Sequence, residues 1–79
     1  MQKEIKVGEK TFIVREMLAV DTDDIDWNNR GDAIKKQVII STGISEDEYK
    51  LLSVKERLVI VQTINEINGF NDFQNPVKQ

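Results

Sequence analysis

The stretch that most constrains this chain runs from Ser53 to Gly69, because it carries both the start and the stop signal of one long helix. The Ser53 hydroxyl can accept a hydrogen bond from the backbone N–H of Glu56, and the Glu56 carboxylate can accept one from the N–H of Ser53. Gly69 supplies the left-handed residue that ends a helix. The roughly fourteen residues between these caps would form a rod of about 21 Å.

The apolar side chains of this helix fall into two rows. At about 100° per residue, Val54, Leu58 and Val61 form one row, and the second row contains Ile60, Ile64 and Ile67. Together the rows cover about half of the circumference, whereas a one-sided surface helix needs roughly 100°. The helix is therefore either sandwiched inside the fold or leaves one row at a subunit or partner surface. The sequence leaves both interpretations open.

The size and composition of the chain limit how it can be stabilised. A chain of 79 residues forms a single domain, here 1–79, and buries only about 60–65% of its unfolded surface. The sequence contains no Cys and no His, which excludes disulfides, thiolate and imidazole ligands, Cys nucleophiles and His general bases. Oligomerisation or partner binding remains as a source of stability, so we expect a homo-oligomer.

The charge pattern narrows the classes of partner. The net charge is −3, and the segment 17–32 alone carries −4. No basic stripe is present to neutralise phosphates, so we expect no nucleic-acid binding. No apolar run approaches the roughly 20 residues of a membrane span, and the N-terminus lacks the apolar region of a signal peptide. We therefore expect no membrane association, and a cytoplasmic protein in the cell that makes it.

The N-terminal segment 4–15 alternates in the manner of a β-hairpin. Gly8 suits the first central position of a type II′ turn, so that Val7 faces Lys10 and Ile5 faces Phe12. Apolar residues then share one face of the hairpin, with Ile13 as the exception on the polar face. A lone hairpin is unstable in water, so its apolar face must lie on helices.

The remaining segments predict further helices. Asp21 can cap a single helical turn that carries Ile25, and 28–31 is interpreted as a loop. Asp32 is the predicted cap of a helix from Ala33 to Thr42. A capping box at 45–48 begins a short helix that ends at residue 51 or 52. The predicted fold is α+β: an N-terminal two-stranded β-hairpin packed on three to four α-helices, the longest being C-terminal, with an ordered core of about 3–69 and a tail at 70–79.

Neither a metal site nor a catalytic site is predicted. A calcium loop that starts at Asp24 would put Asp26 and Asn28 at ligand positions. However, Asn29 replaces the required Gly, and Lys35 replaces the bidentate Glu. The segment is better explained as a solvated acidic turn, and a calcium-binding module remains an alternative. The acidic residues at 46–48 are interpreted as first-turn residues that favour the helix dipole. No phosphate loop or nucleophile elbow is present. We expect no cofactor, no metal and no enzymatic activity.

The candidate binding residues are apolar. Trp27 is either a partner anchor or a lid over the edge of the core. Phe70 and Phe73 either fold back on the end of the long helix or serve as exposed anchors. Adding the second row of the long helix gives the predicted partner-binding set: Ile60, Ile64, Ile67, Phe70, Phe73 and Trp27.

Several motifs of the chain, taken together, resemble one known family. They are the hairpin that ends in Phe12-Ile13-Val14-Arg15-Glu16-Met17, the acidic stretch, the segment Ser41-Thr42-Gly43-Ile44-Ser45-Glu46-Asp47-Glu48-Tyr49, the run Leu51-Leu52-Ser53-Val54-Lys55-Glu56-Arg57-Leu58, and the ending Ile64-Asn65-Glu66-Ile67-Asn68-Gly69-Phe70 followed by Asp72-Phe73. This pattern spans nearly the whole chain and resembles the tail assembly chaperones of tailed bacteriophages and prophages.

The resemblance implies a non-enzymatic helper of virion morphogenesis. Such chaperones coat the long helical tape measure protein, keep it in solution and help to recruit tail tube protein. They self-associate, act in the host bacterial cytoplasm and are absent from the mature virion. Some also have a longer form made by translational frameshifting, whereas this chain has the length of the short form. The family has no invariant catalytic residues to place on this sequence.

The main alternative comes from another class of protein. An acidic regulatory or inhibitor protein would bind a basic target site through Asp21–Asp32. Charge-driven binding of that kind weakens steeply with ionic strength, whereas apolar groove binding persists.

Overall fold

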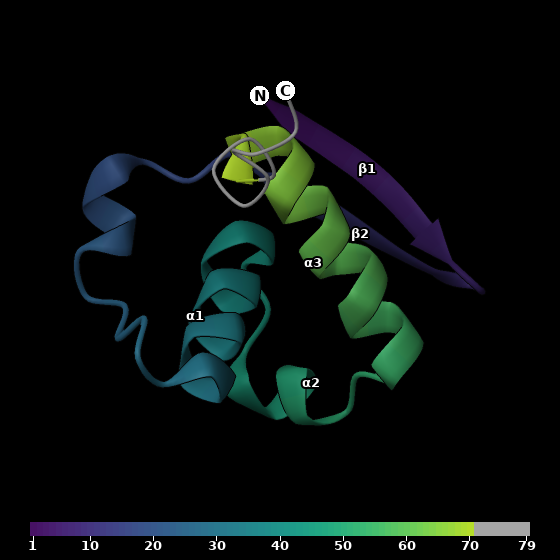
Figure 1. Ribbon diagram of the computed structural model, residues 1–79. Helices are drawn as coiled ribbons and strands as arrows, with labels where there is room; N and C mark the ends of the chain where they lie inside the picture. Colours follow the sequence, from purple (N-terminus) through teal and green to yellow (C-terminus); the bar gives the residue numbers. More distant parts are fainter. Residues whose placement is uncertain (71–79) are drawn as a thin grey trace, which may run out of the picture.

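The computed structural model describes residues 1–70 and contains a two-stranded antiparallel hairpin followed by helices (Figure 1). The element order is β1 (Gln2–Val7), β2 (Lys10–Arg15), a 3-10 turn η1 (Ala19–Thr22), α1 (Arg30–Thr42), α2 (Glu46–Lys50) and α3 (Val54–Asn68). α3 is the longest element, so the predicted α+β fold is confirmed.

The hairpin has the predicted register. Val7 pairs with Lys10 and Ile5 pairs with Phe12. Gly8 adopts a φ of +63°, which an L side chain rarely adopts, and this lets the chain reverse over two residues. Val14 on the inner face is fully buried, whereas Ile13 on the outer face is exposed.

The core lies where α3 passes under the hairpin and meets α1. α3 contacts β1, β2 and α1, and α1 also contacts β2. The central buried cluster contains Val14, Met17, Val38, Ile60 and Ile64. In Figure 1, α3 crosses in front of β2 and α1 stands beside α3, with the C-terminal ends of the two helices close together and their N-terminal ends apart.

Both capping boxes form as predicted. The Ser53 hydroxyl accepts from the Glu56 N–H at 3.1 Å, and the Glu56 carboxylate accepts from the Ser53 N–H at 2.7 Å. Ser45 and Glu48 repeat the arrangement at 3.1 and 2.9 Å. Gly69, with a φ of +72°, ends α3 as expected.

Three predicted helix boundaries were wrong. α1 begins at Arg30, three residues before the predicted start, because the Asn29 side chain accepts from the Asp32 N–H at 3.2 Å and is the cap instead of Asp32. The turn η1 begins before Asp21, whose carboxylate accepts from the Leu18 N–H at 2.9 Å from inside the turn. α2 ends at Lys50, before either predicted end.

A long-range hydrogen bond fixes the end of α3 to the exit of the hairpin. The Asn68 side-chain oxygen accepts from the Met17 N–H at 2.9 Å. The Asn68 side-chain amide donates to the Ile64 carbonyl at 2.8 Å. Asn68 thus satisfies backbone groups of both segments, and the chain leaves β2 over the end of α3.

Glu56, besides capping α3, is one of the buried polar residues of the fold. Glu56 as a whole residue is only 8% exposed, and its carboxylate lies 3.3 Å from the Lys10 ammonium group at the hairpin turn. The Ser53 backbone N–H lowers the pKa of Glu56, and Lys10 lowers it further, against the opposing effect of burial. The ionised carboxylate therefore joins the start of α3 to the hairpin.

Replacing Ile64 with Ala should destabilise the fold strongly. Ile64 has no exposed surface, so the change leaves a cavity in the core, and we expect a loss of about 2–5 kcal/mol in the free energy of unfolding. Urea unfolding of Ile64→Ala measures this loss, with Leu58→Ala on the exposed row as the matched control at roughly 0.5 kcal/mol. Equal losses in the two variants would contradict the assignment of Ile64 to the core.

The Glu56 carboxylate should make the stability depend on pH. Because its pKa is lowered in the folded state below the ordinary 4.5, its contribution is present at neutral pH and is lost as pH falls through the folded-state value. We expect Glu56→Gln to unfold at lower urea concentration than the wild type at about pH 7. The two midpoints should converge in acid below the carboxylate's folded-state pKa. A midpoint difference that stays constant across this range would argue against an ionised Glu56 at the hairpin.

Candidate partner-binding surface

The structure separates the two apolar rows of α3. Ile60 and Ile64 have no exposed surface and lie in the core. Val54 and Leu58 in the other row are 76% and 55% exposed. The hairpin therefore covers one side of α3 and leaves the N-terminal half of the other side open. These two neighbouring exposed aliphatic side chains make this side of α3 a candidate interaction surface.

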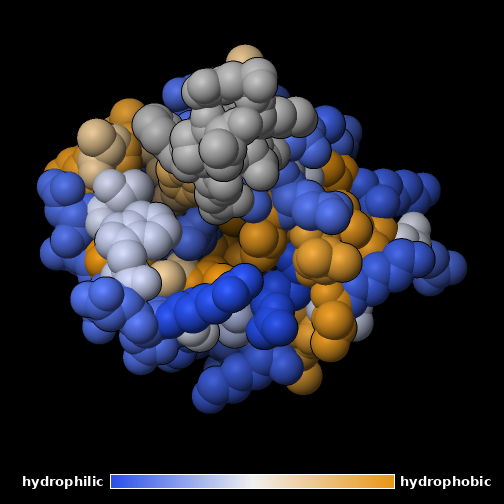
Figure 2. Space-filling model, viewed as in Figure 1, coloured by the Kyte–Doolittle hydropathy of each residue, from blue (hydrophilic) through white to orange (hydrophobic). Residues whose placement is uncertain are grey.

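A groove runs along this open side, between the N-terminal halves of α1 and α3. Its volume is about 200 Å³, and its apolar lining consists of Ile34 from α1 and Val54, Leu58 and Val61 from α3. The helices diverge here, as Figure 1 shows. In the same view, Figure 2 shows hydrophobic side chains gathered in the middle of this face, with strongly hydrophilic side chains among them.

The groove has basic residues in its lining. Arg30, the first residue of α1, and Arg57 on α3 line it together with the apolar side chains. Neither guanidinium has a carboxylate within 4.0 Å among residues 1–70. Lys36, which does not line the groove, pairs with Asp32 at 3.2 Å and donates to the Asp24 carbonyl at 3.3 Å. Arg30 and Arg57 therefore give this face a positive charge in a chain whose net charge is −3.

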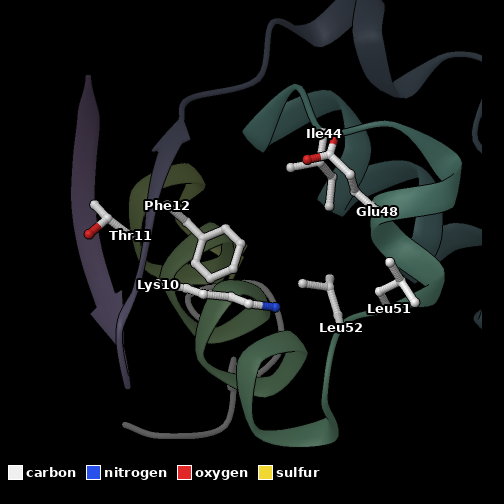
Figure 3. A pocket seen from close by; sticks show the side chains of 7 residues that line it. All are labelled: Lys10, Thr11, Phe12, Ile44, Glu48, Leu51 and Leu52. Carbon is white, nitrogen blue, oxygen red and sulfur yellow. The ribbon is translucent and has the colours of Figure 1, made fainter.

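A second concave region lies between β2 and α2 (Figure 3). It has a volume of about 410 Å³, and its apolar walls are Phe12, Ile44, Leu51 and Leu52. Phe12 and Leu52 point toward one another across it, whereas Thr11 points away. This cleft could accept an apolar side chain, and the 77% exposure of Leu51 extends the apolar surface toward the start of α3.

The charged groups of this cleft already have partners. Lys10 pairs with Glu56 at 3.3 Å. The Glu48 carboxylate caps α2 by accepting from the Ser45 N–H at 2.9 Å. Because both groups serve the fold, the cleft has less charge to offer a ligand than the groove does.

The predicted binding residues on α3 need correction. Ile60 and Ile64 are completely enclosed, so of the two interpretations left open by the sequence the structure places both residues in the core and not among the surface residues of the predicted partner-binding set. The hairpin packs on their side of α3. Ile67 is half-buried against the core. The residues that replace them at the surface are Val54 and Leu58, which the sequence placed in the other row.

The aromatic candidates lie at the opposite end of α3. The rings of Trp27 and Phe70 meet edge to face, with centroids 6.3 Å apart and an interplanar angle of 87°. Phe70 is half-buried against the core, whereas Trp27 remains 53% exposed. Trp27 therefore packs against Phe70 at the end of α3 and keeps about half of its surface exposed. Phe73 lies outside the described residues.

The acidic segment is held by local hydrogen bonds. The Asp21 carboxylate accepts from the Leu18 N–H at 2.9 Å, and Asp26 accepts from the Asn28 N–H at 3.0 Å. Asp23 and Asp24 are exposed. Within residues 1–70, no group of three or more Asp, Glu, His or Cys side chains is placed to hold a metal ion.

Over the same residues, none of the helices has the length and apolar character needed to cross a membrane. Comparisons of the chain with protein-family models, with curated proteins and with solved structures find no match.

Proposed function

We propose that this chain is a tail assembly chaperone of a tailed bacteriophage or prophage. It is non-enzymatic, binds the tape measure protein, and keeps that protein in solution while the tail is assembled in the host bacterial cytoplasm. Tail tube protein is a further partner, and copies of the chain associate with one another. The mature virion does not contain it.

The exposed row of α3 is the observation that carries this proposal. A protein that coats a long helical client needs an apolar groove that accepts many similar segments through shape. Val54 and Leu58 lie one helical turn apart and are exposed, and Ile34 faces them across the groove between α1 and α3. A client helix placed there would cover side chains that the domain itself leaves in water.

An acidic regulatory protein is the second candidate. The exposed carboxylates of Asp23 and Asp24 favour it, because they are available to a basic target. The two functions use different surfaces of the molecule, and they respond differently to ionic strength. Binding that persists in high salt supports the chaperone.

Polar replacement of the exposed row should abolish client binding without unfolding the domain. We expect Val54→Ser combined with Leu58→Ser to lower the amount of soluble tape measure protein several-fold when both proteins are co-expressed. Since both side chains are exposed, the free energy of unfolding should change by no more than about 1 kcal/mol. Centrifugation of the lysate measures the first effect, and urea unfolding measures the second.

The matched control is Leu18→Ser combined with Val20→Ser. These two side chains are 68% and 64% exposed, but they lie at η1 and do not line the groove. Full solubilisation by this control supports the groove as the client site. Equal loss in both double variants would instead indicate that general surface hydrophobicity, not the groove, retains the client.

A further inference from the structure

The groove between α1 and α3 combines an apolar lining with two guanidinium groups. Val54, Leu58 and Val61 follow the i, i+4, i+7 spacing at which one helix presents a continuous row to another, and Ile34 forms the opposite wall. Arg30 and Arg57 add positive charge from the two sides, one from each helix. The apolar row of the groove favours a helix as its occupant. The two arginines favour negative charge on that helix, beside the apolar side chains that enter the groove.

We infer that the groove selects an amphipathic helix whose apolar row is flanked by carboxylates. Glu or Asp at these flanks would meet Arg30 and Arg57, which can each donate two parallel hydrogen bonds to a carboxylate. Lys or Arg at the same flanks would be repelled. This inference rests on the proposed function, since it names the chemistry of the client segments that the chaperone recognises.

The acidic segment of the same chain does not occupy this site. Its Asp24 carbonyl accepts a hydrogen bond from the Lys36 ammonium group of α1 at 3.3 Å, and Lys36 also pairs with Asp32 within α1 at 3.2 Å. In Figure 1, the η1 turn lies on the side of α1 that faces away from α3. With no carboxylate of residues 1–70 within 4.0 Å, Arg30 and Arg57 are the groups of the described structure that can meet carboxylates supplied by another molecule.

The selectivity can be measured with designed helical peptides. Two fluorescently labelled peptides share one row of Leu at the i, i+4, i+7 spacing and differ only in carrying Glu or Lys beside that row. Anisotropy titrations with the full chain at low salt should give a dissociation constant about tenfold lower for the Glu peptide than for the Lys peptide. The difference should shrink at high salt, because exposed charge pairs are screened.

Charge reversal at the groove provides the decisive comparison. Arg30→Glu combined with Arg57→Glu should invert the preference, so that the Lys peptide binds more tightly. Lys6→Glu combined with Arg15→Glu makes the same change in net charge on exposed hairpin residues and should leave the preference unchanged. Circular dichroism melts confirm that both double variants are folded.

Three other outcomes would overturn the inference, and they differ in what they imply for the proposed function. Equal affinity for both peptides, with client solubilisation still dependent on Val54 and Leu58, overturns the charge selectivity and leaves the proposed function standing. Binding of neither peptide, with client solubilisation unaffected by the groove variants, overturns both. A third outcome is self-association, measured by light scattering, that is lost in the Arg30→Glu, Arg57→Glu variant and is not reduced by the Glu peptide. The groove would then bind a second copy of the chain and not a client helix.

Discussion

The packing of one side of α3 against the hairpin determines the rest of this structure. Ile60 and Ile64 are fully buried in the core that α3 forms with the hairpin and α1, and burial of two such side chains stabilises the fold by about 3–6 kcal/mol. A two-stranded hairpin is not stable alone, so the strands need α3 as much as α3 needs the strands. The Glu56 and Lys10 pair and the Asn68 hydrogen bond to Met17 lie toward opposite ends of α3 and fix its position along the hairpin.

This packing also decides what remains on the surface. α1 approaches α3 at its C-terminal half and diverges from the N-terminal half, so the second apolar row is only partly covered (Figure 1). Val54 and Leu58 stay in water beside Arg57. A domain of this size has too few elements to enclose a long helix on all sides. The same shortage of covering elements therefore leaves the apolar groove and its basic residues available for a partner.

Sequence reasoning located the elements of the fold but not the inner side of α3. The capping boxes and the turn at Gly8 were predictable because their signals lie within a few residues of each other. Which row of α3 faces inward depends on contacts between segments far apart in the chain, and both rows contain good core residues. The position of Lys10 opposite Glu56 is the one signal that could have marked the inner side, but only after the hairpin had been placed on α3. Asn29 was missed as a cap because Asp32 offered an equally good signal three residues later.

Solvent accessibility of the methyl groups on α3 tests the central claim most directly. The measurement is the paramagnetic relaxation of assigned methyl signals by a soluble probe, at a concentration where light scattering shows a monomer. The structure predicts strong relaxation for Val54 and Leu58 and almost none for Ile60 and Ile64. Equal protection of all four residues in the monomer would show that the domain encloses α3 by itself. The groove would then have no exposed apolar row to offer a partner.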